Sequence, residues 1–255
     1  MPYKLGCHIS PPKDRKRTLK LSEFRVALPA FPQAQDWYAK TSGIKMHRND
    51  ELGDCTCAAK ANLEQVWSAN AGSEVIQSDD LVVLDYERVG GYDPTRTDKD
   101  GYNPTDNGAV MSEVLKYWQD SGRIGPYLEV HADDWEEVCY ACDVGVGLYC
   151  GLSLPQCAMD AMDKDVPTWQ MPTTKSEKRI IGGHCVIDCS YNVQEGVLGT
   201  GTWAKVVPTT ADFVAAFFSE MYVIFSNQFM AGGISPAGLN GQAIIDAMEQ
   251  VKERG

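Results

Sequence analysis

The chain has 255 residues, and its 44% hydrophobic and 23% charged residues are typical of a globular protein with a sizeable core. A formal net charge of −12 argues against a nucleic-acid-binding surface, which requires a clustered excess of Lys and Arg, so we expect no nucleic-acid partner. No stretch approaches the roughly 20 apolar residues that a bilayer-spanning helix needs, so we expect no membrane association.

Residues 1–35 are predicted to form an extended N-terminal arm, because prolines between positions 11 and 32 exclude long helices. The arm carries a basic patch at residues 13–20 (KDRKRTLK). This patch is interpreted either as a solvated segment or as a tether that docks onto an acidic partner. The start of the chain contains no apolar secretory segment, so no signal peptide is predicted and synthesis without export is expected.

A helix is predicted over residues 55–71. Apolar residues recur at i, i+4, i+7 and i+8 from Ala59, Asp54 can cap the N-terminus, and Gly72 ends the run. Cys55 would then open the helix, where unpaired amide N–H groups and the helix dipole stabilise negative charge. Both effects favour the thiolate, which is the nucleophilic form of cysteine, so Cys55 is a candidate nucleophile.

Two further patterns are considered as metal sites and rejected. The acidic loop at 90–108 fails the EF-hand register, because Arg96 stands at the first acidic position and Asn107 at the final Glu. Cys139 and Cys142 form a CxxC pair in a helix-like run, but no second pair lies at zinc spacing. We therefore expect no metal and no cofactor. The nine cysteines are expected to be reduced and mostly structural, with a disulfide among them as the alternative.

The second half of the chain changes character. A helix at about 110–121 is followed, from about residue 143, by short apolar segments of strand type. A helix opened by Thr209 or Thr210 and a striped C-terminal helix complete the chain. The predicted strands are residues 144–154, 184–191, 198–207 and 221–225.

These elements predict one domain at residues 36–255, with an α+β layout. A helical lobe would span about 36–142, a β-rich lobe about 143–230, and the last helix about 239–254. In such a two-part arrangement a cleft runs between the halves, and one wall would supply Cys55.

His184 follows two glycines and opens a predicted strand on the other side of that cleft. A cysteine that opens a helix, with a histidine roughly 130–150 residues later, resembles the order in papain-like cysteine peptidases. Trp203, in the next predicted segment, adds to the likeness. The resemblance implies a papain-like fold, with a helical half and an antiparallel β half. It also implies catalysis by Cys55 and His184 on a peptide or amide substrate held in the cleft.

The resemblance also gives a role to Asn49. Papain-like peptidases carry a polar amide six residues before the nucleophile, and Asn49 lies at that distance from Cys55. Its N–H would help to stabilise the tetrahedral oxyanion, an effect typically worth about 2.7–4 kcal/mol. Cys57 is the competing nucleophile, but it lies about 200° around the helix from Cys55, so only one can face the cleft. The helix N-terminus and the distance from Asn49 favour Cys55.

One departure from the family pattern concerns the residue that orients the histidine. The family places an Asn two residues before the strand Trp, and that position is Gly201 here. Thr200 and Thr202 flank it and are possible orienters of His184. Asp188 is on the same strand face as His184 but roughly 13 Å away at strand rise, which is too far.

More narrowly, the whole chain resembles papain-like proteins encoded by bacteriophages and prophages, through motifs from Lys4-Leu5-Gly6 to Gly182-Gly183-His184. That resemblance implies a location in the host cytoplasm or the virion. It leaves two functions open: a cysteine peptidase, or a virion structural, decoration or attachment protein that keeps the fold with little or no catalysis. In the second case the N-terminal arm would contact other virion proteins.

Overall fold

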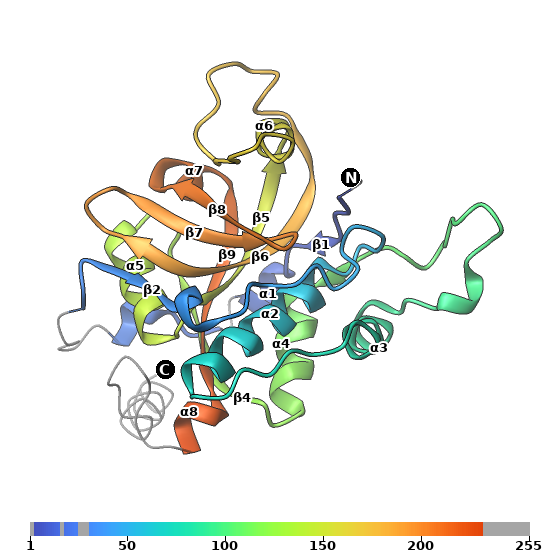
Figure 1. Ribbon diagram of the computed structural model, residues 1–255, viewed down its shortest axis with the longest axis horizontal. Helices are drawn as coiled ribbons and strands as arrows, with labels where there is room; N and C mark the ends of the chain where they lie inside the picture. The colour runs from blue at the N-terminus through green and yellow to red at the C-terminus, as the bar shows by residue number, and fades with distance from the viewer. Residues whose placement is uncertain (1–2, 16–17, 25–30, 232–255) are drawn as a thin grey trace.

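The computed structural model describes residues 3–15, 18–24 and 31–231 (Figure 1). The C-terminal helix predicted at 239–254 lies outside the described residues. Among the helices that are described, none is both long and apolar enough to cross a membrane.

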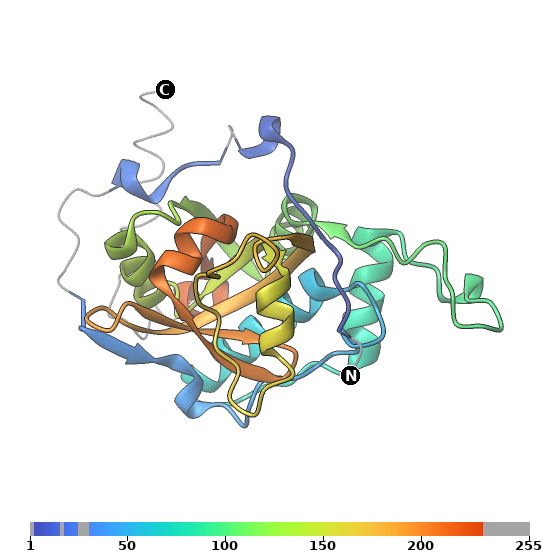
Figure 2. The ribbon, with the colours of Figure 1, turned by 90° about the horizontal axis from the view of Figure 1, so that it is seen from above.

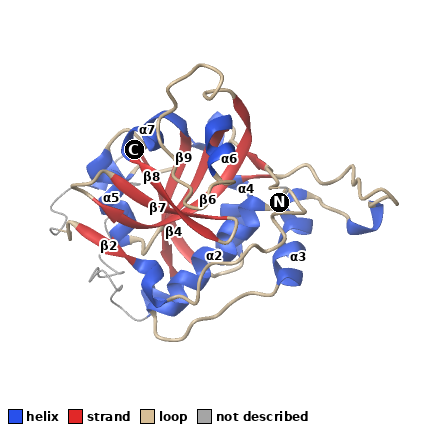
Figure 3. Ribbon diagram, turned by 45° about the horizontal axis from the view of Figure 1, so that its top comes forward, coloured by secondary structure: helices blue, strands red, loops and turns tan. Residues whose placement is uncertain are grey.

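An antiparallel sheet of seven strands forms the centre of the molecule (Figure 3). Its strands follow the order β4-β9-β5-β6-β7-β8, and β2 also pairs with β6. The combination of helices with this sheet confirms the predicted α+β class. The strands are β2 (Ala34–Asp36), β4 (Ile124–Val130), β5 (Leu148–Pro155), β6 (Ile180–Asn192), β7 (Val197–Thr202), β8 (Lys205–Thr210) and β9 (Phe218–Ser226).

Each face of the sheet packs on its own apolar core. One core involves the helices α2, α3 and α4, and the other involves α5, α6 and α7. Because side chains alternate along a strand, neighbouring residues of β6 enter different cores: Cys185 the first and Val186 the second. The helices are α2 (Cys55–Asn70), α3 (Asp79–Gly90), α4 (Met111–Asp120), α5 (Trp135–Val144), α6 (Gln156–Ala161), α7 (Ala211–Phe217) and α8 (Asn227–Ala231), with short turns η2 (Trp37–Lys40) and η3 (Pro94–Arg96).

Several elements differ from their prediction. The single strand predicted at 198–207 is wrong: β7 and β8 form a tight hairpin, whose turn residues Trp203 and Ala204 have φ of 45° and 59°. The strand predicted from residue 144 begins at Leu148, because α5 continues to Val144. Helix α3 has no counterpart among the predicted elements, and β4 is a strand within the stretch expected to be helical.

The N-terminal arm crosses over the body (Figure 2). It begins with β1 (Cys7–His8), which pairs in parallel with the short strand β3 (Ala109–Val110). The helical turns α1 (Pro12–Arg15) and η1 (Leu21–Phe24) follow. The described residues 3–15 and 18–24 therefore contain one short strand and two short helical turns, and residues 34–35 already belong to β2 of the sheet.

Candidate active site

Cys55 is the first residue of α2, and 1% of its surface is exposed. Asp54 occupies the N-cap position, but its side chain makes no capping hydrogen bond. The backbone carbonyl of Asp54 instead accepts from the amides of Cys57 and Ala58, at 2.8 and 3.0 Å. The N–H of Gly53 donates to Asp106 Oδ1 at 2.9 Å, and this bond fixes the turn before the helix. Cys55 thus lies at the predicted helix N-terminus, but away from solvent.

The surroundings of the Cys55 thiol keep it protonated. Burial raises the pKa of Cys55 well above its ordinary value, and the nearby Cys7 raises it further. Hydrogen bonds from the backbone N–H groups of Cys185 and Gly6 lower this pKa by less. The helix terminus does not produce a thiolate in this conformation, because the cost of burying the charge exceeds the stabilisation from these donors.

His184 lies on β6 and is buried, with 1% exposed. Its ring stacks on Trp203, with centroids 4.0 Å apart and planes 14° from parallel. Nε2 lies 2.7 Å from Thr202 Oγ1. Burial lowers the pKa of His184 to about 3, so the imidazole is neutral. Nδ1 is buried without a hydrogen-bond partner among the described residues, which leaves it as the ring nitrogen that could serve a thiol.

The two possible orienters have different partners. Thr202 contacts the His184 ring, whereas the hydroxyl of Thr200 donates to Asp188 Oδ1 at 2.5 Å. Gly201 faces the opposite way, since a Cβ there would come within 2.6 Å of the Tyr38 hydroxyl. An Asn at 201 would therefore clash with this core. The alternation of side chains along β7 gives the position beside the histidine to residue 202.

Cys55 and His184 reach neighbouring positions from opposite halves of the molecule. The backbone N–H of Cys185, the residue that follows His184, lies close enough to the Cys55 sulfur to lower the pKa of its thiol. No hydrogen bond joins the thiol to the ring in the described part of the chain, because Nε2 contacts Thr202 and Nδ1 is unpaired. The two predicted groups are thus brought near each other, without the thiol–imidazole bond of a working dyad.

Asn49 is buried beside the arm. Its side-chain amide donates to the carbonyl oxygens of Leu52, at 3.0 Å, and Lys4, at 3.4 Å. The backbone N–H of Lys4 donates in return to the Asn49 carbonyl at 3.1 Å. An amide that donates to a carbonyl oxygen has the chemistry of an oxyanion donor. In this conformation one of those oxygens belongs to the arm.

The remaining cysteines offer no better activated group. Cys57 is buried in the first core, where burial and Asp54 raise the pKa of its thiol. Cys139 and Cys142 are buried in the second core. All nine cysteines are free thiols. Over the described ranges, no group of three His, Cys, Asp or Glu could hold a metal ion.

Residues 3–8 of the arm cover this site. The ring of Tyr3 stacks on Trp203 with centroids 4.6 Å apart. The N–H of Gly6 points at the Cys55 sulfur, and the carbonyl of Gly6 accepts from the N–H of Ala109 at 2.8 Å. We call residues 3–8 the cleft segment, because they lie between the start of α2 and strand β6.

Glycines allow the cleft segment to lie backbone against backbone. A Cβ on Gly6 would come within 1.8 Å of the Gly53 carbonyl oxygen. A Cβ on Gly183 would come within 2.0 Å of the Cys7 carbonyl oxygen. Approaches this short exclude any side chain, so the glycine before His184 makes room for the arm. Sequence reasoning missed this blockage. Its sequence signal was glycine at residues 6, 53, 108, 182 and 183.

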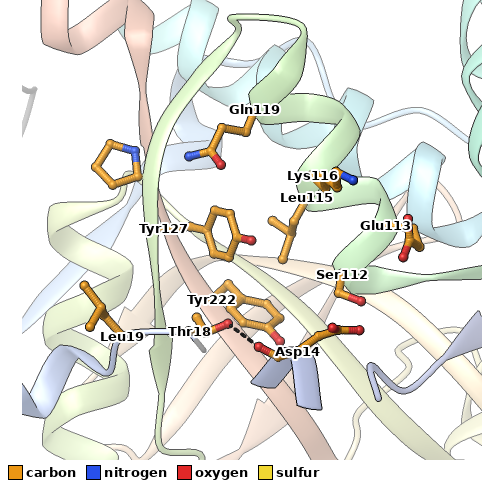
Figure 4. Close-up of a pocket in the computed structure, with 11 residues that line it drawn as sticks. Asp14, Thr18, Leu19, Ser112, Glu113, Leu115, Lys116, Gln119, Tyr127 and Tyr222 are labelled. Carbon is orange, nitrogen blue, oxygen red and sulfur yellow. Dashed lines mark hydrogen bonds between the residues drawn. The ribbon is translucent and has the colours of Figure 1, made fainter. Parts of the chain in front are cut away.

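Further along, the arm is held by charges and leaves a gap beneath it. Arg15 forms an ion pair with the buried Glu129 of β4, and the N–H of Ser10 donates to Glu220 at 2.9 Å. We call the described residues 10–15 and 18–20 the outer segment. It roofs a cavity of about 480 Å³, in which Tyr127 and Tyr222 meet edge to face (Figure 4). The cavity is lined by Asp14, Thr18, Leu19, Ser112, Glu113, Leu115, Lys116, Gln119, Pro126, Tyr127 and Tyr222, so it is separate from Cys55 and His184.

No protein-family model and no curated protein matches the sequence. Solved structures do match the fold. Xylellain, a cysteine protease from Xylella fastidiosa, is 16% identical, with a TM-score of 0.63 over 88% of this chain and 96% of its own. Digestive procathepsin L2 from Tenebrio molitor is 13% identical, with a TM-score of 0.59 over 88% and 78%. Procathepsin B from Trypanosoma congolense is 8% identical, with a TM-score of 0.56 over 88% and 86%. The chain therefore has the papain-like fold that its sequence predicted.

Proposed function

We propose that the protein is a papain-like cysteine peptidase or related thiol amidohydrolase, and that the described conformation is its latent form. The observation that carries the proposal is the convergence of two elements. Cys55 opens α2 against strand β6, and β6 presents a neutral His184 held by Thr202 and Trp203. A nucleophile, a base and a group that orients the base thus come together, as thiol acyl transfer requires.

The chemistry begins when the cleft segment leaves. His184 Nδ1 would take the proton of Cys55, and the thiolate would add to the acyl carbon of the substrate. The Cys55 backbone N–H and the Asn49 amide would hold the oxyanion. The His184 imidazolium would then protonate the leaving amine as the C–N bond breaks. Water, deprotonated by His184, would hydrolyse the thioester and restore the Cys55 thiol.

Latency follows from the electrostatics of the closed site. A thiol with a raised pKa beside an imidazole with a pKa of about 3 holds both groups neutral. Removal of the cleft segment would admit water and reduce the desolvation that causes both shifts. The two pKa values would then move toward each other, and the thiolate–imidazolium pair would become accessible.

The cleft segment also indicates the form of the substrate. Its strand β1 pairs with β3 in parallel, and the N–H of Ala109 donates to the carbonyl of Gly6. Backbone pairing with an exposed strand is a common way to bind an extended peptide. We therefore favour an extended peptide as the substrate over a small amide.

A single substitution in the arm tests the function. Gly6→Val places a side chain against the Gly53 carbonyl and should displace the cleft segment without changing Cys55, His184 or Asn49. We expect iodoacetamide to label Cys55 at least about tenfold faster than in the wild type, the factor given by each unit of pKa lowered toward neutrality. We also expect cleavage of a peptide library to appear.

Three controls accompany this variant. Ile9→Ala changes an arm residue that is 51% exposed and should leave labelling slow. Gly6→Val combined with Cys55→Ser should abolish both labelling at residue 55 and cleavage, whereas Gly6→Val with Cys57→Ser should keep both. If Gly6→Val exposes the site to labelling but cleaves no peptide, the hydrolase proposal fails.

The second candidate is a phage virion structural, decoration or attachment protein. It is favoured by the filled site, the missing thiol–imidazole bond and the motif resemblance to phage-encoded proteins. Under this proposal the protein acts in the virion or the host cytoplasm. It would co-purify with particles at high copy number, and Cys55→Ala would leave infectivity unchanged. Because Arg15 pairs with Glu129 of its own chain, contact with other virion proteins would require the arm to leave the body.

A further inference from the structure

Three cysteines meet where the cleft segment crosses the site. Cys7 comes from the arm, Cys55 from α2 and Cys185 from β6, and all three are free, buried and part of one core. Their exposed fractions are 6%, 1% and 3%. The proposed mechanism uses Cys55 alone, so Cys7 and Cys185 have no catalytic role.

The register of the sheet places Cys7 beside Cys185. Gly151 of β5 is the cross-strand partner of Cys185, and a Cβ on Gly151 would lie 3.5 Å from the Cys7 sulfur. Gly183 is two residues before Cys185 on the same face of β6, and a Cβ there would lie 3.7 Å from the Cys7 Cβ. Paired residues on one face have Cβ atoms about 4.5–5.5 Å apart. The Cys7 side chain therefore lies over the pair formed by Gly151 and Cys185.

The mutual influence of the thiols agrees with this placement. After burial, Cys7 makes the largest contribution to raising the pKa of Cys185, and it also raises the pKa of Cys55. The Cys55 sulfur itself faces the backbone N–H groups of Gly6 and Cys185. Cys7 thus interacts with Cys185 through its side chain, whereas the backbone at Gly6 covers Cys55, and this favours Cys185 as the covalent partner of Cys7.

We propose that Cys7 and Cys185 form a reversible disulfide that fastens the cleft segment over Cys55. This inference rests on the proposed function, because a latch matters only if Cys55 acts when uncovered. The bond would convert a noncovalent blockage into a covalent one. It would leave the nucleophile unmodified, so reduction would return a competent site.

The oxidant is a low-molecular-weight disulfide such as oxidised glutathione. When the cleft segment lifts, the Cys7 thiolate attacks one sulfur of the oxidant and releases one glutathione thiolate. When the segment returns, the Cys185 thiolate attacks the Cys7 sulfur of the mixed disulfide and releases the second. Two protein thiols and one oxidised glutathione give one protein disulfide and two glutathione thiols, which take up the two protons.

Peptide mapping of the full chain tests the bond directly. The protein is equilibrated in glutathione buffers, free thiols are blocked with N-ethylmaleimide, and trypsin is applied without reductant. We expect residues 5–13 joined to residues 180–205, with Cys189→Ser used to assign the bond to Cys185. A link from residues 5–13 to residues 49–60, which contain Cys55, would overturn the assignment. No link at any glutathione ratio would overturn the proposal.

Cys55 accessibility supplies the second readout. Oxidation should slow iodoacetamide labelling of Cys55 at least about tenfold, in line with the stabilisation that disulfides typically give a closed form. Dithiothreitol should reverse the effect, and Cys7→Ser should not respond to the oxidant. An equal response in Cys7→Ser would overturn the latch. Peptide cleavage by Gly6→Val is measured separately, so failure of the disulfide and failure of the hydrolase give different results.

Discussion

The two segments of the arm are held by different physics. The cleft segment lies backbone to backbone against Gly53 and Gly183, in contacts that allow no Cβ. The outer segment is held by the Arg15–Glu129 ion pair above a cavity of about 480 Å³. Close packing is intolerant of added volume, whereas an ion pair whose arginine is partly exposed to solvent can be weakened gradually. Sterics therefore control whether the site is covered, and charge tunes how often the arm lifts.

The largest expected effect comes from added volume at the cleft segment. Gly183→Ala should displace the segment as Gly6→Val does, because its methyl group would meet the Cys7 carbonyl oxygen. We expect each variant to lower the free energy of unfolding by about 1–3 kcal/mol, as overpacking typically does. The double variant should lose far less free energy of unfolding than the two single losses added together, because one displaced segment relieves both clashes. Additive losses in urea denaturation would show that the two glycines do not share one contact.

The second effect is on the histidine that the cleft segment helps to bury. In the wild type the pKa of His184 is about 3, so the ring should stay neutral down to about that pH. In Gly6→Val the pKa should lie nearer the ordinary value of about 6.5. An NMR titration of the imidazole protons checks this directly. An unchanged pKa in Gly6→Val would mean that Trp203 and the sheet, rather than the arm, desolvate the ring.

The same shift has a consequence for stability. The unfolded chain binds a proton at His184 below about pH 6.5 and the folded chain does not, so stability falls as the pH drops from about 6.5 to 3, by at most about 1.4 kcal/mol per unit. Asp188 acts oppositely, because burial raises its pKa to about 6 and its proton stabilises the fold at lower pH. The measurement is therefore the difference between the wild type and His184→Gln in chemical denaturation.

A smaller effect concerns the residue that orients the imidazole. Thr202→Val in the Gly6→Val background should lower kcat by about tenfold and leave KM unchanged. This loss is part of the rate acceleration of about 10²–10⁴-fold that proton transfer by a positioned side chain typically contributes. Thr200→Val is the matched control, because its hydroxyl donates to Asp188 and does not contact the ring. Equal losses in the two variants would indicate general damage to β7.

The sequence predicted the parts of the site that depend on local pattern. The helix that Cys55 opens, the strand of His184 and the α+β class follow from apolar periodicity and glycine boundaries. Helix α3 was also readable, with Ser78 as a capping residue, Asp79 in the first turn and Gly91 at the end. No element was predicted for this stretch, which ends where the predicted acidic loop at 90–108 begins.

What could not be predicted depends on tertiary register. A hairpin turn at Trp203 and Ala204 decides that Thr202, and not residue 201, meets His184. The path of the arm is set by contacts with Gly53 and Gly183, which are far from residues 3–8 in the sequence. No period or spacing encodes such approaches. The arm was therefore predicted to be extended, but the surface that it contacts was not predicted.

The smallest effect belongs to the outer segment. Arg15 Nε donates to Glu129 Oε1 at 3.0 Å, with 35% of the arginine side chain and 8% of the glutamate exposed. Because 35% of the arginine side chain is exposed and water reaches Glu129 once the arm lifts, Arg15→Leu should cost about 1 kcal/mol or less. The variant should raise tryptic cleavage after Lys13 by no more than about fivefold, which is the same free energy expressed as a ratio. Added salt should raise cleavage of the wild type but leave Arg15→Leu unchanged. If Arg15→Leu labels Cys55 as fast as Gly6→Val does, the outer segment holds the whole arm, and the steric account of coverage is wrong.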